Sequence, residues 1–222
     1  MILNLGKMDY AESLAVQRKL NQLRNEGRIE DCMIVVEHPD VYTAGIHWIP
    51  GPETEGLDVI RVERGGSITY HGPGQFITYY IVNLKERNIN VLNLINKIQE
   101  CSIELLGKWG IGADPRLGKE TGIWTGKRKI ASIGLAVKGF STLHGCALNV
   151  STDLSNFNRI HPCDFNPDVM TSMEEILGSQ VDIAKITMQY MDLAREKLGM
   201  GEIIKNKRDL EDLNELLSET VP

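Results

Sequence analysis

Three β-rich segments in the second half of the chain place the strongest constraint on its fold. They cover residues 121–125, 129–137 and 141–150, and the short turns between them contain Gly126-Lys127 and Lys138-Gly139. Strands joined by such short turns run antiparallel, because a parallel neighbour needs a crossover of about a dozen residues or more. The chain is therefore expected to contain a sheet built from consecutive hairpins.

Helices and further strands are predicted on both sides of these hairpins. Helical spacing of apolar residues, or a Ser-x-x-Glu start, marks the segments 9–24, 91–109, 172–177 and 183–198. Apolar runs with β-branched residues mark strands over 32–37, 59–62 and 76–84. Strands in the middle with helices at both ends and one between them indicate an α+β fold, with a mixed and mostly antiparallel sheet and packed helices.

Length and charge narrow the class of protein. With 222 residues, 42% hydrophobic and 24% charged, the sequence is expected to form a single catalytic domain over 1–222 that ends in a charged helical tail over 201–222. A net charge of −6 disfavours nucleic acid and anionic membranes as partners. No apolar stretch of about 20 residues and no signal-peptide pattern stand out, so we expect a cytoplasmic protein. A single domain of this kind needs no partner subunit, so a monomer is expected.

The segment 64–75 combines glycines with polar side chains. Glycine occupies positions 65, 66, 72 and 74, and Arg64 and His71 stand among them. Such glycines let a backbone approach a ligand closely or adopt a positive φ. A tight turn between two strands is the simpler interpretation, but this composition exceeds what a turn needs. We therefore predict a ligand-binding loop.

The cysteines are considered one by one, because the sequence contains no C-x-x-C pair. The three that lie in apolar segments, and are expected to be core residues, are Cys32, Cys101 and Cys146. Two His-x-Cys pairs, His144 with Cys146 and His161 with Cys163, leave a metal site as an alternative, because residues i and i+2 of a strand share a face. A chain that builds its own core has little need of a structural metal, so none is predicted.

Cys163 follows a proline outside any apolar run and is predicted to be an accessible thiol. A thiol with a pKa of about 8.5 is only a few per cent ionised at neutral pH, so a nucleophilic Cys163 needs a cation or a base beside it. His161 is close in sequence. Lys129 is a second candidate, because a lysine that enters an apolar strand must find a partner for its charge. Lys127 fits a solvated turn better.

Four motifs occur in one order along the chain: RGGSITYHGPGQ at 64–75, KIASIG at 129–134, HGCALNV at 144–150 and Pro162-Cys163. Together they resemble the octanoyltransferase family of lipoate biosynthesis, the octanoyl-acyl carrier protein:protein N-octanoyltransferases, over roughly residues 1–180. The resemblance implies the fold of the biotin and lipoate protein ligase catalytic domains.

The resemblance also implies an acyltransferase that works without a cofactor. A cysteine thiolate, here Cys163, takes an octanoyl or lipoyl group from acyl carrier protein, and a lysine of an acceptor protein then takes it as an amide. Acceptors would be lipoyl domains of 2-oxoacid dehydrogenase acyltransferase subunits and the glycine-cleavage carrier protein. The residue that lowers the thiol pKa and shuttles the proton maps onto Lys129. Substrate binding maps onto Arg64, Gly65, Gly66, Ser67, Ile68, Thr69, Tyr70, His71, Ser132, Ile133, Gly134, His144, Gly145, Cys146 and Ala147. Backbone N–H groups around Gly65-Gly66 or of Gly145 are candidate oxyanion donors.

The sequence departs from the family pattern at three places. His161 and Asp164 flank the Pro-Cys motif where Asn and Gly are usual, and Ser67 replaces the more usual Asp or Gln. A carboxylate beside the thiol raises its pKa, so we expect Asp164 to tune the reaction, with His161 as a compensating cation.

Two other functions remain open. An ATP-dependent lipoate or biotin ligase of the same fold uses a lysine and no acylated cysteine, and a non-catalytic module that binds a lipoyl domain or a carrier protein would leave Cys163 a bystander. Because acyl carrier proteins are acidic, a basic patch of Lys127, Arg128 and Lys129 is the predicted docking surface.

Overall fold

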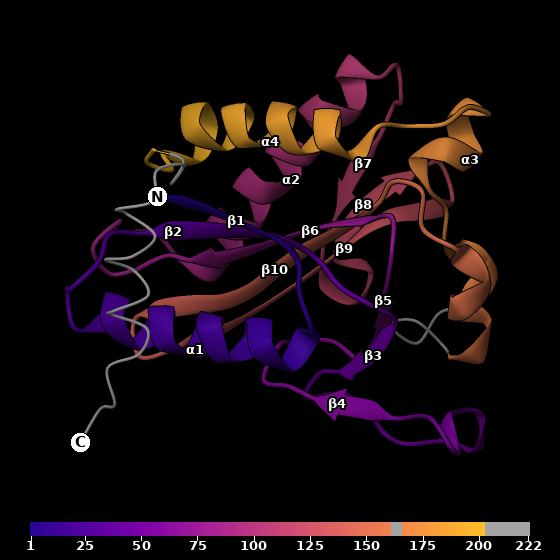
Figure 1. Ribbon diagram of the computed structural model, residues 1–222, viewed down its shortest axis with the longest axis horizontal. Coiled ribbons are helices and arrows are strands. Elements are labelled where there is room, and N and C mark those ends of the chain that lie inside the picture. Colours follow the sequence, from indigo (N-terminus) through magenta and orange to yellow (C-terminus); the bar gives the residue numbers. More distant parts are fainter. Residues whose placement is uncertain (161–165, 203–222) are drawn as a thin grey trace.

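The computed structural model describes residues 1–160 and 166–202. Its main feature is a seven-stranded sheet in the order β1-β2-β6-β10-β9-β8-β7 (Figure 1). The strands are β1 Ile2–Lys7, β2 Cys32–Glu37, β6 Gln75–Ile81, β7 Asp114–Arg116, β8 Gly122–Thr125, β9 Arg128–Lys138 and β10 Ser141–Asn149. Only β1 and β2 pair in parallel in this sheet as described, so the predicted mixed, mostly antiparallel arrangement is confirmed.

A smaller sheet of three strands stands beside the large one. Its strands are β3 Val41–Ala44, β4 Val59–Arg61 and β5 Ile68–His71, in the order β4-β3-β5. Strand β5 lies inside the segment 64–75 that was predicted to be a loop, so that prediction holds only for the residues before and after it. Alternate side chains of β5 point to opposite faces, which separates the residues of this segment into two groups.

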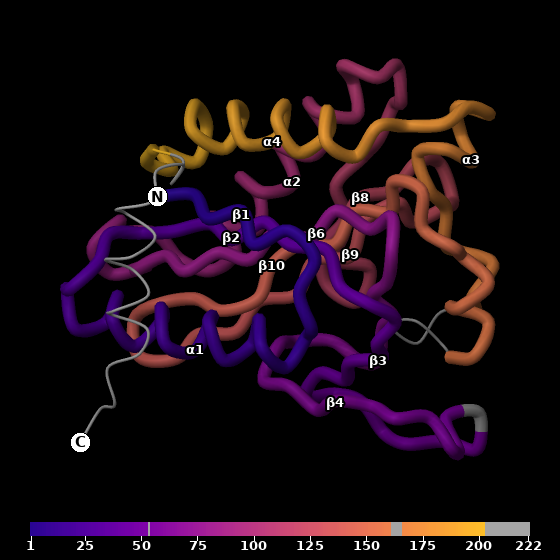
Figure 2. Tube along the Cα trace, viewed as in Figure 1, coloured from indigo at the N-terminus to yellow at the C-terminus, as the bar shows by residue number. Residues whose placement is uncertain are grey.

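The described residues contain four α-helices, of which the three long ones pack on the two faces of the large sheet. The four are α1 Tyr10–Asn25, α2 Val91–Lys108, α3 Met173–Leu177 and α4 Ile183–Leu198, and short 3-10 helices occupy Pro52–Thr54, Gly118–Glu120, Leu154–Arg159 and Pro167–Val169. In Figure 2 α1 runs along one side of the sheet, while α2 and α4 run along the other. The predicted helix starts are confirmed, since the side chains of Asp9 and Ser172 cap α1 and α3.

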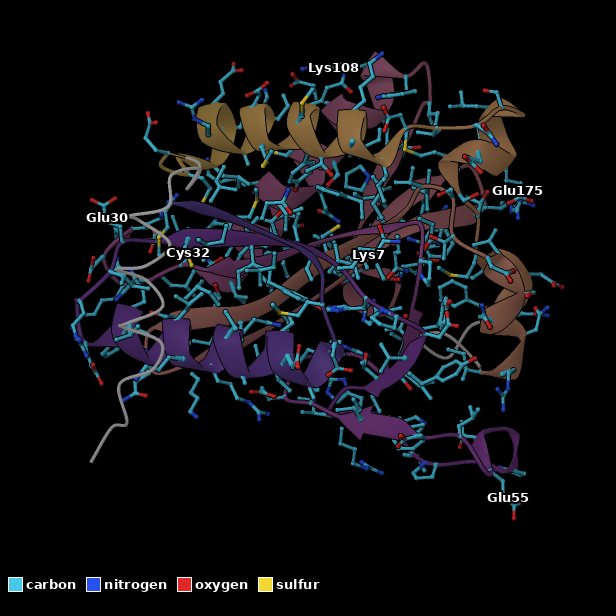
Figure 3. The ribbon with its side chains drawn as sticks, in the orientation of Figure 1. Lys7, Glu30, Cys32, Glu55, Lys108 and Glu175 are labelled. Carbon is cyan, nitrogen blue, oxygen red and sulfur yellow. The ribbon has the colours of Figure 1, made fainter. Side chains whose placement is uncertain are left out.

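Each helical layer buries its own apolar cluster against the sheet. The cluster under α2 and α4 includes Ile98, Leu105, Ile130, Ile186 and Tyr190, and the cluster under α1 includes Leu14, Leu20, Ile34, Ile77 and Leu143. The three cysteines predicted to be core residues are buried, and Cys32 is labelled among the packed side chains in Figure 3, while Glu55 and Lys108 lie at the periphery. No helix in residues 1–160 and 166–202 is long and apolar enough to cross a membrane.

Local sequence patterns located the helices and the hairpin strands but not several of the other strands. The predicted helices and the strands of the hairpins agree with the structure to within a few residues. Strands β1, β3, β5 and β7 were not predicted. The last three have only three or four residues, and β1 carries little of the apolar alternation that marks a strand. The predicted tail over 201–222 lies outside the described residues from position 203 onward.

Candidate active site

A cavity of about 590 Å³ opens beside the large sheet, and segment 64–71 forms part of its wall. Every predicted binding residue lines it except Ile68 and Tyr70. Those two side chains belong to a separate apolar cluster with Phe157 and Met170, because they point to the other face of β5. The structure thus brings residues from three distant motifs to one cavity and leaves these two out of it.

Arg64 shapes the loop at the start of this wall. Its guanidinium donates to the carbonyl oxygens of Ser67 at 2.8 Å and Thr43 at 2.7 Å, and it is 8% exposed. The N–H of Gly65 donates to the carbonyl oxygen of Leu135 at 3.1 Å. Arg64 therefore holds the loop from within the protein, and the Gly65 N–H is already engaged. Gly145 lies inside β10 between its partners Tyr79 on β6 and Gly134 on β9, so its N–H belongs to the sheet ladder. Of the oxyanion donors that sequence suggested, Gly66 is left.

Lys129 is 1% exposed, at the start of β9. Residue pairing between β8 and β9 shifts next to it, and Ile130 and Ala131 both join the core cluster under α2 and α4. Two successive residues on one face are the mark of a β-bulge, which re-aims the side chain before it. Lys129 consequently shares a face with Ser132, which lines the cavity.

Glycine at position 122 makes room for this lysine. A Cβ atom there would lie 2.6 Å from Lys129 Cε and 2.4 Å from the carbonyl oxygen of Ala131, and Gly122 has a φ of +151°. The Lys129 ammonium lies 5.8 Å from the centroid of the Trp124 ring, within reach of a cation–π attraction. The lysine is thus enclosed by β8, as its unusual place in an apolar strand indicated.

A chain of hydrogen bonds connects the Lys129 backbone to His71. Thr171 donates its N–H to the Lys129 carbonyl, and its own carbonyl accepts from Asn149 Nδ2, both at 3.0 Å. Gln75 Nε2 lies 2.9 Å from Asn149 Oδ1, and Gln75 Oε1 lies 2.7 Å from His71 Nδ1. Burial lowers the pKa of His71 to about 3. Sequence reasoning missed Gln75 and Asn149 as site residues, although both lie in motifs that it quoted.

Two further ring groups stand beside His71. Tyr10 stacks on it at 5.8 Å between ring centroids, and His38 contacts it edge-on at 6.2 Å. His38 Nδ1 lies 2.7 Å from the Met8 carbonyl and its Nε2 lies 2.9 Å from the Tyr79 hydroxyl. No local sequence signal marked His38 or Tyr10 as part of a site.

His144 has a backbone φ of +63°, which is uncommon for a residue other than glycine. Its ring packs edge-on against Tyr79, and its Nε2 lies 3.6 Å from a carboxylate oxygen of Glu63. Within the described residues neither ring nitrogen has a hydrogen-bond partner, and burial lowers the pKa of His144 to about 4. Cys146 belongs to the cluster on the opposite face. The idea that His144 and Cys146 share a face as metal ligands was therefore wrong, because the positive φ turns the histidine away.

The predicted basic docking patch is corrected by the structure. Lys129 is buried, so it cannot belong to a surface patch. Arg128 pairs with Glu175 at 2.7 Å and donates to the Met170 carbonyl at 2.7 Å. Of the three cations, only Lys127 is an exposed turn residue of the kind that the prediction requires.

The predicted nucleophile Cys163 lies outside the described residues, together with His161 and Asp164. The chain after it is described again from Asn166. Met170 then forms a β-bridge with Lys129. Met170, which follows the Pro-Cys motif in the sequence, thus lies beside the buried lysine.

Comparison with known proteins decides the family. The model of the lipoyl protein ligase A/B catalytic domain matches residues 9–192. This chain belongs to that family. It is 49% identical over 201 residues to a probable octanoyltransferase 2 of Picrophilus torridus, covering 90% of this chain and 80% of the relative. It is 44% identical over 190 residues to an octanoyltransferase of Alkaliphilus metalliredigens, covering 82% and 87%. The resemblance drawn from the four motifs is confirmed.

Solved structures of lipoate protein ligases share the fold of this family member. A lipoate-protein ligase A bound with ATP superposes with a TM-score of 0.75 at 16% identity, covering 98% of this chain and 94% of the other. A putative lipoate protein ligase of T. acidophilum with bound lipoic acid gives 0.71 at 16% identity, covering 96% and 94%. The predicted ligase-like fold is therefore confirmed, and at this identity the likeness concerns the fold alone.

Proposed function

We propose that this chain is an octanoyltransferase that moves an octanoyl or lipoyl group from acyl carrier protein to a lysine of a lipoyl domain, through a thioester on Cys163. The observation that carries the proposal is the buried Lys129, which a β-bulge turns to the same face of the sheet as the cavity-lining Ser132. The octanoyltransferase relatives at 49% and 44% identity support it.

The first half-reaction forms the acyl-enzyme. The Lys129 ammonium stabilises the Cys163 thiolate, which attacks the thioester carbonyl of the donor. The new C–S bond forms as the bond to the pantetheine sulfur breaks, and Lys129 protonates that departing sulfur. Lys129 is then neutral and ready to act as a base. A buried lysine suits this role, because a low-dielectric environment strengthens its effect on a nearby thiolate.

The second half-reaction makes the amide. The amine of the acceptor lysine attacks the thioester carbon, one of its protons passes to Lys129, and the C–S bond breaks to restore the thiolate. The acyl chain needs an apolar channel, and Ile77, Ile133 and Leu135 contribute such surface to the cavity. At about 0.8 kcal/mol per buried CH₂, a fitted channel can select chain length.

The partners follow from the same proposal. The donor is octanoyl-acyl carrier protein, and the acceptors are lipoyl domains of 2-oxoacid dehydrogenase acyltransferase subunits and the glycine-cleavage carrier protein. A structure titled as an archaeal lipoylation system, a bipartite ligase with its E2 lipoyl domain from Thermoplasma acidophilum, has the same fold with a TM-score of 0.70 at 15% identity, covering 98% of this chain and 91% of the other. That likeness supports a lipoyl domain as the acceptor class.

The deciding experiment measures intact mass after incubation with octanoyl-acyl carrier protein in the absence of ATP. We expect an octanoyl adduct on the wild type and none on Cys163→Ala, followed by loss of the adduct when a lipoyl domain is added. An absent adduct on the wild type overturns the proposal. Acylation of the lipoyl domain only with ATP and free octanoate would instead support a ligase, the reaction class of the ATP-bound structure with the same fold.

A further inference from the structure

Only one assignment of donors and acceptors satisfies the hydrogen bonds that connect Thr171 to His71. The Thr171 carbonyl can only accept, so the Asn149 atom at 3.0 Å from it must be the amide nitrogen. Asn149 therefore turns its oxygen to Gln75, and the Gln75 atom 2.9 Å away must be the donating Nε2. The same nitrogen lies 3.4 Å from the Tyr70 carbonyl, another acceptor. Gln75 Oε1 is thus left to face His71.

This direction sets the tautomer of His71. An amide oxygen only accepts, so His71 Nδ1, 2.7 Å from Gln75 Oε1, must carry the proton. In a neutral ring Nε2 is then a bare acceptor. The ring lines the cavity and no described residue hydrogen-bonds to Nε2, so this nitrogen is the one available to a bound molecule.

The surroundings keep the ring uncharged. His71 is 6% exposed, stacks on Tyr10 and lies near His38. Burial is the largest cause of its lowered pKa, and the positive charges of Arg64 and of protonated His38 or His144 would oppose a second proton. A neutral acceptor is suited to an incoming amine, because a histidine cation would repel the ammonium form of that amine.

A primary amine that attacks a thioester brings two hydrogens to the reaction. One leaves as the proton that Lys129 takes in the proposed reaction, and the other stays on nitrogen in the product amide. The second hydrogen needs an acceptor if the lone pair is to point at the carbonyl carbon. The backbone carbonyl of Lys129 and the ring of His71 lie at the two ends of one hydrogen-bond chain, through Thr171, Asn149 and Gln75.

We propose that Gln75 and Asn149 are positioning residues that hold His71 as its Nδ1–H tautomer, so that Nε2 accepts the retained N–H of the acceptor lysine during amide formation. The proposal rests on the proposed function for the identity of the amine. The tautomer itself rests only on the hydrogen-bond chain.

The tautomer is tested by ¹⁵N NMR of the full chain labelled at its five histidines, with His71→Gln to assign the signals. We expect a protonated Nδ1 and an unprotonated Nε2 at neutral pH in the wild type, and loss of this state in Gln75→Leu. A wild-type ring protonated at Nε2, or a tautomer unchanged in Gln75→Leu, overturns the proposal. Because no substrate is needed, this result stands whatever becomes of the proposed function.

The positioning role is tested by measuring the two half-reactions separately. Gln75→Leu is expected to slow amide transfer from the isolated acyl-enzyme about tenfold more than it slows acylation. Equal slowing of both steps indicates a structural role and overturns the proposal. Gln189→Leu is the matched control, since Gln189 bonds the Trp109 indole on the far side of the sheet and should alter neither step.

A second variant covers the case in which Gln75→Leu does not fold. Asn149→Ala frees the Gln75 amide to rotate, so we expect both tautomers of His71 in the NMR spectrum and a smaller, about threefold, selective loss of amide transfer. A single Nδ1–H tautomer with unchanged transfer in this variant overturns the role of Asn149. A wild type that forms no acyl-enzyme refutes the proposed function instead, and the NMR result then stands alone.

Discussion

The two faces of the large sheet differ in the polarity of the side chains that they bury. Under α2 and α4 a large apolar cluster includes Ile98 and Leu105, and the buried polar side chains Gln99 and Ser102 of α2 donate to backbone carbonyls. On the face of α1 the apolar cluster gives way to buried polar groups, with His38 and His144 packed against Tyr79. Buried polar groups lower stability unless they are paired, so the first face stabilises the fold while the second accepts a cost.

The division separates most of the apolar packing from the polar groups around the cavity, although Val91 and Ile95 of α2 also line the cavity. The polar face also holds the unusual backbone, with His144 at φ +63° and Gly122 at φ +151°. Residues in sparsely populated conformations persist only where the surrounding structure over-determines them. The apolar face supplies that support through the sheet. Variants on the two faces should therefore fail in different ways.

The largest effect is expected at Lys129. Lys129→Met keeps the length and removes the buried charge, so acyl-enzyme formation should fall about 100-fold or more, while the melting temperature stays the same or rises. Single-turnover rates and thermal unfolding check this. Lys127→Met, at the exposed turn, should change the rate less than twofold. A Lys129→Met rate within about threefold of wild type would remove the contrast between the faces.

The next largest effect is expected under α2. Ile98 is fully buried, so Ile98→Ala should lower the free energy of unfolding by about 2 to 4 kcal/mol and leave the rate of the folded enzyme unchanged. Urea denaturation and kcat measure the two quantities. Leu92→Ala on the same helix, where the side chain is 45% exposed, should cost less than about 1 kcal/mol. A large loss of kcat in Ile98→Ala would contradict the separation.

Gly122→Ala should lower both the acylation rate and the stability, each by less than the two variants above. Its methyl group would meet Lys129 Cε and the Ala131 carbonyl, so we expect about a tenfold slower acylation together with a loss of about 1 to 3 kcal/mol of stability. Gly112→Ala is the control, because a Cβ there meets nothing within 4 Å. Stability loss without rate loss would show that Lys129 does not depend on this glycine.

The smallest effect is a pH dependence on the polar face. Burial lowers the pKa of His144 to about 4, so below its unfolded value near 6.5 the unfolded chain binds the proton and the folded chain does not. Stability should then fall as pH drops from about 6.5 to 4, by about 1 kcal/mol per pH unit for this histidine. Unfolding of wild type and His144→Asn at pH 7 and 5 measures it, and asparagine tolerates the left-handed φ. Equal pH dependence in the two proteins would contradict the assignment.

Much of the fold was predictable because it rests on local patterns. Apolar periodicity and caps located the four helices of residues 1–160 and 166–202, and the paired short turns located the hairpins of β8, β9 and β10. Strands β3 and β7, of four and three residues, were not predictable, since their pairing partners rather than their own side chains make them strands. The motif residues were predicted as a group, yet Ile68 and Tyr70 do not line the cavity, because the unforeseen strand β5 turns them to its other face.

Local sequence identified the reactive residue types and the order in which they occur, because helix periodicity, turn chemistry and motif spacing act over a few neighbours. The orientation and protonation state of each residue depended on contacts between segments that are distant in the sequence. A bulge opposite β8 turns Lys129 toward the cavity side, a carbonyl at Thr171 orients the amides that set the tautomer of His71, and a left-handed backbone separates His144 from Cys146. Pairing register and burial create these effects, and neither exists until the strands assemble.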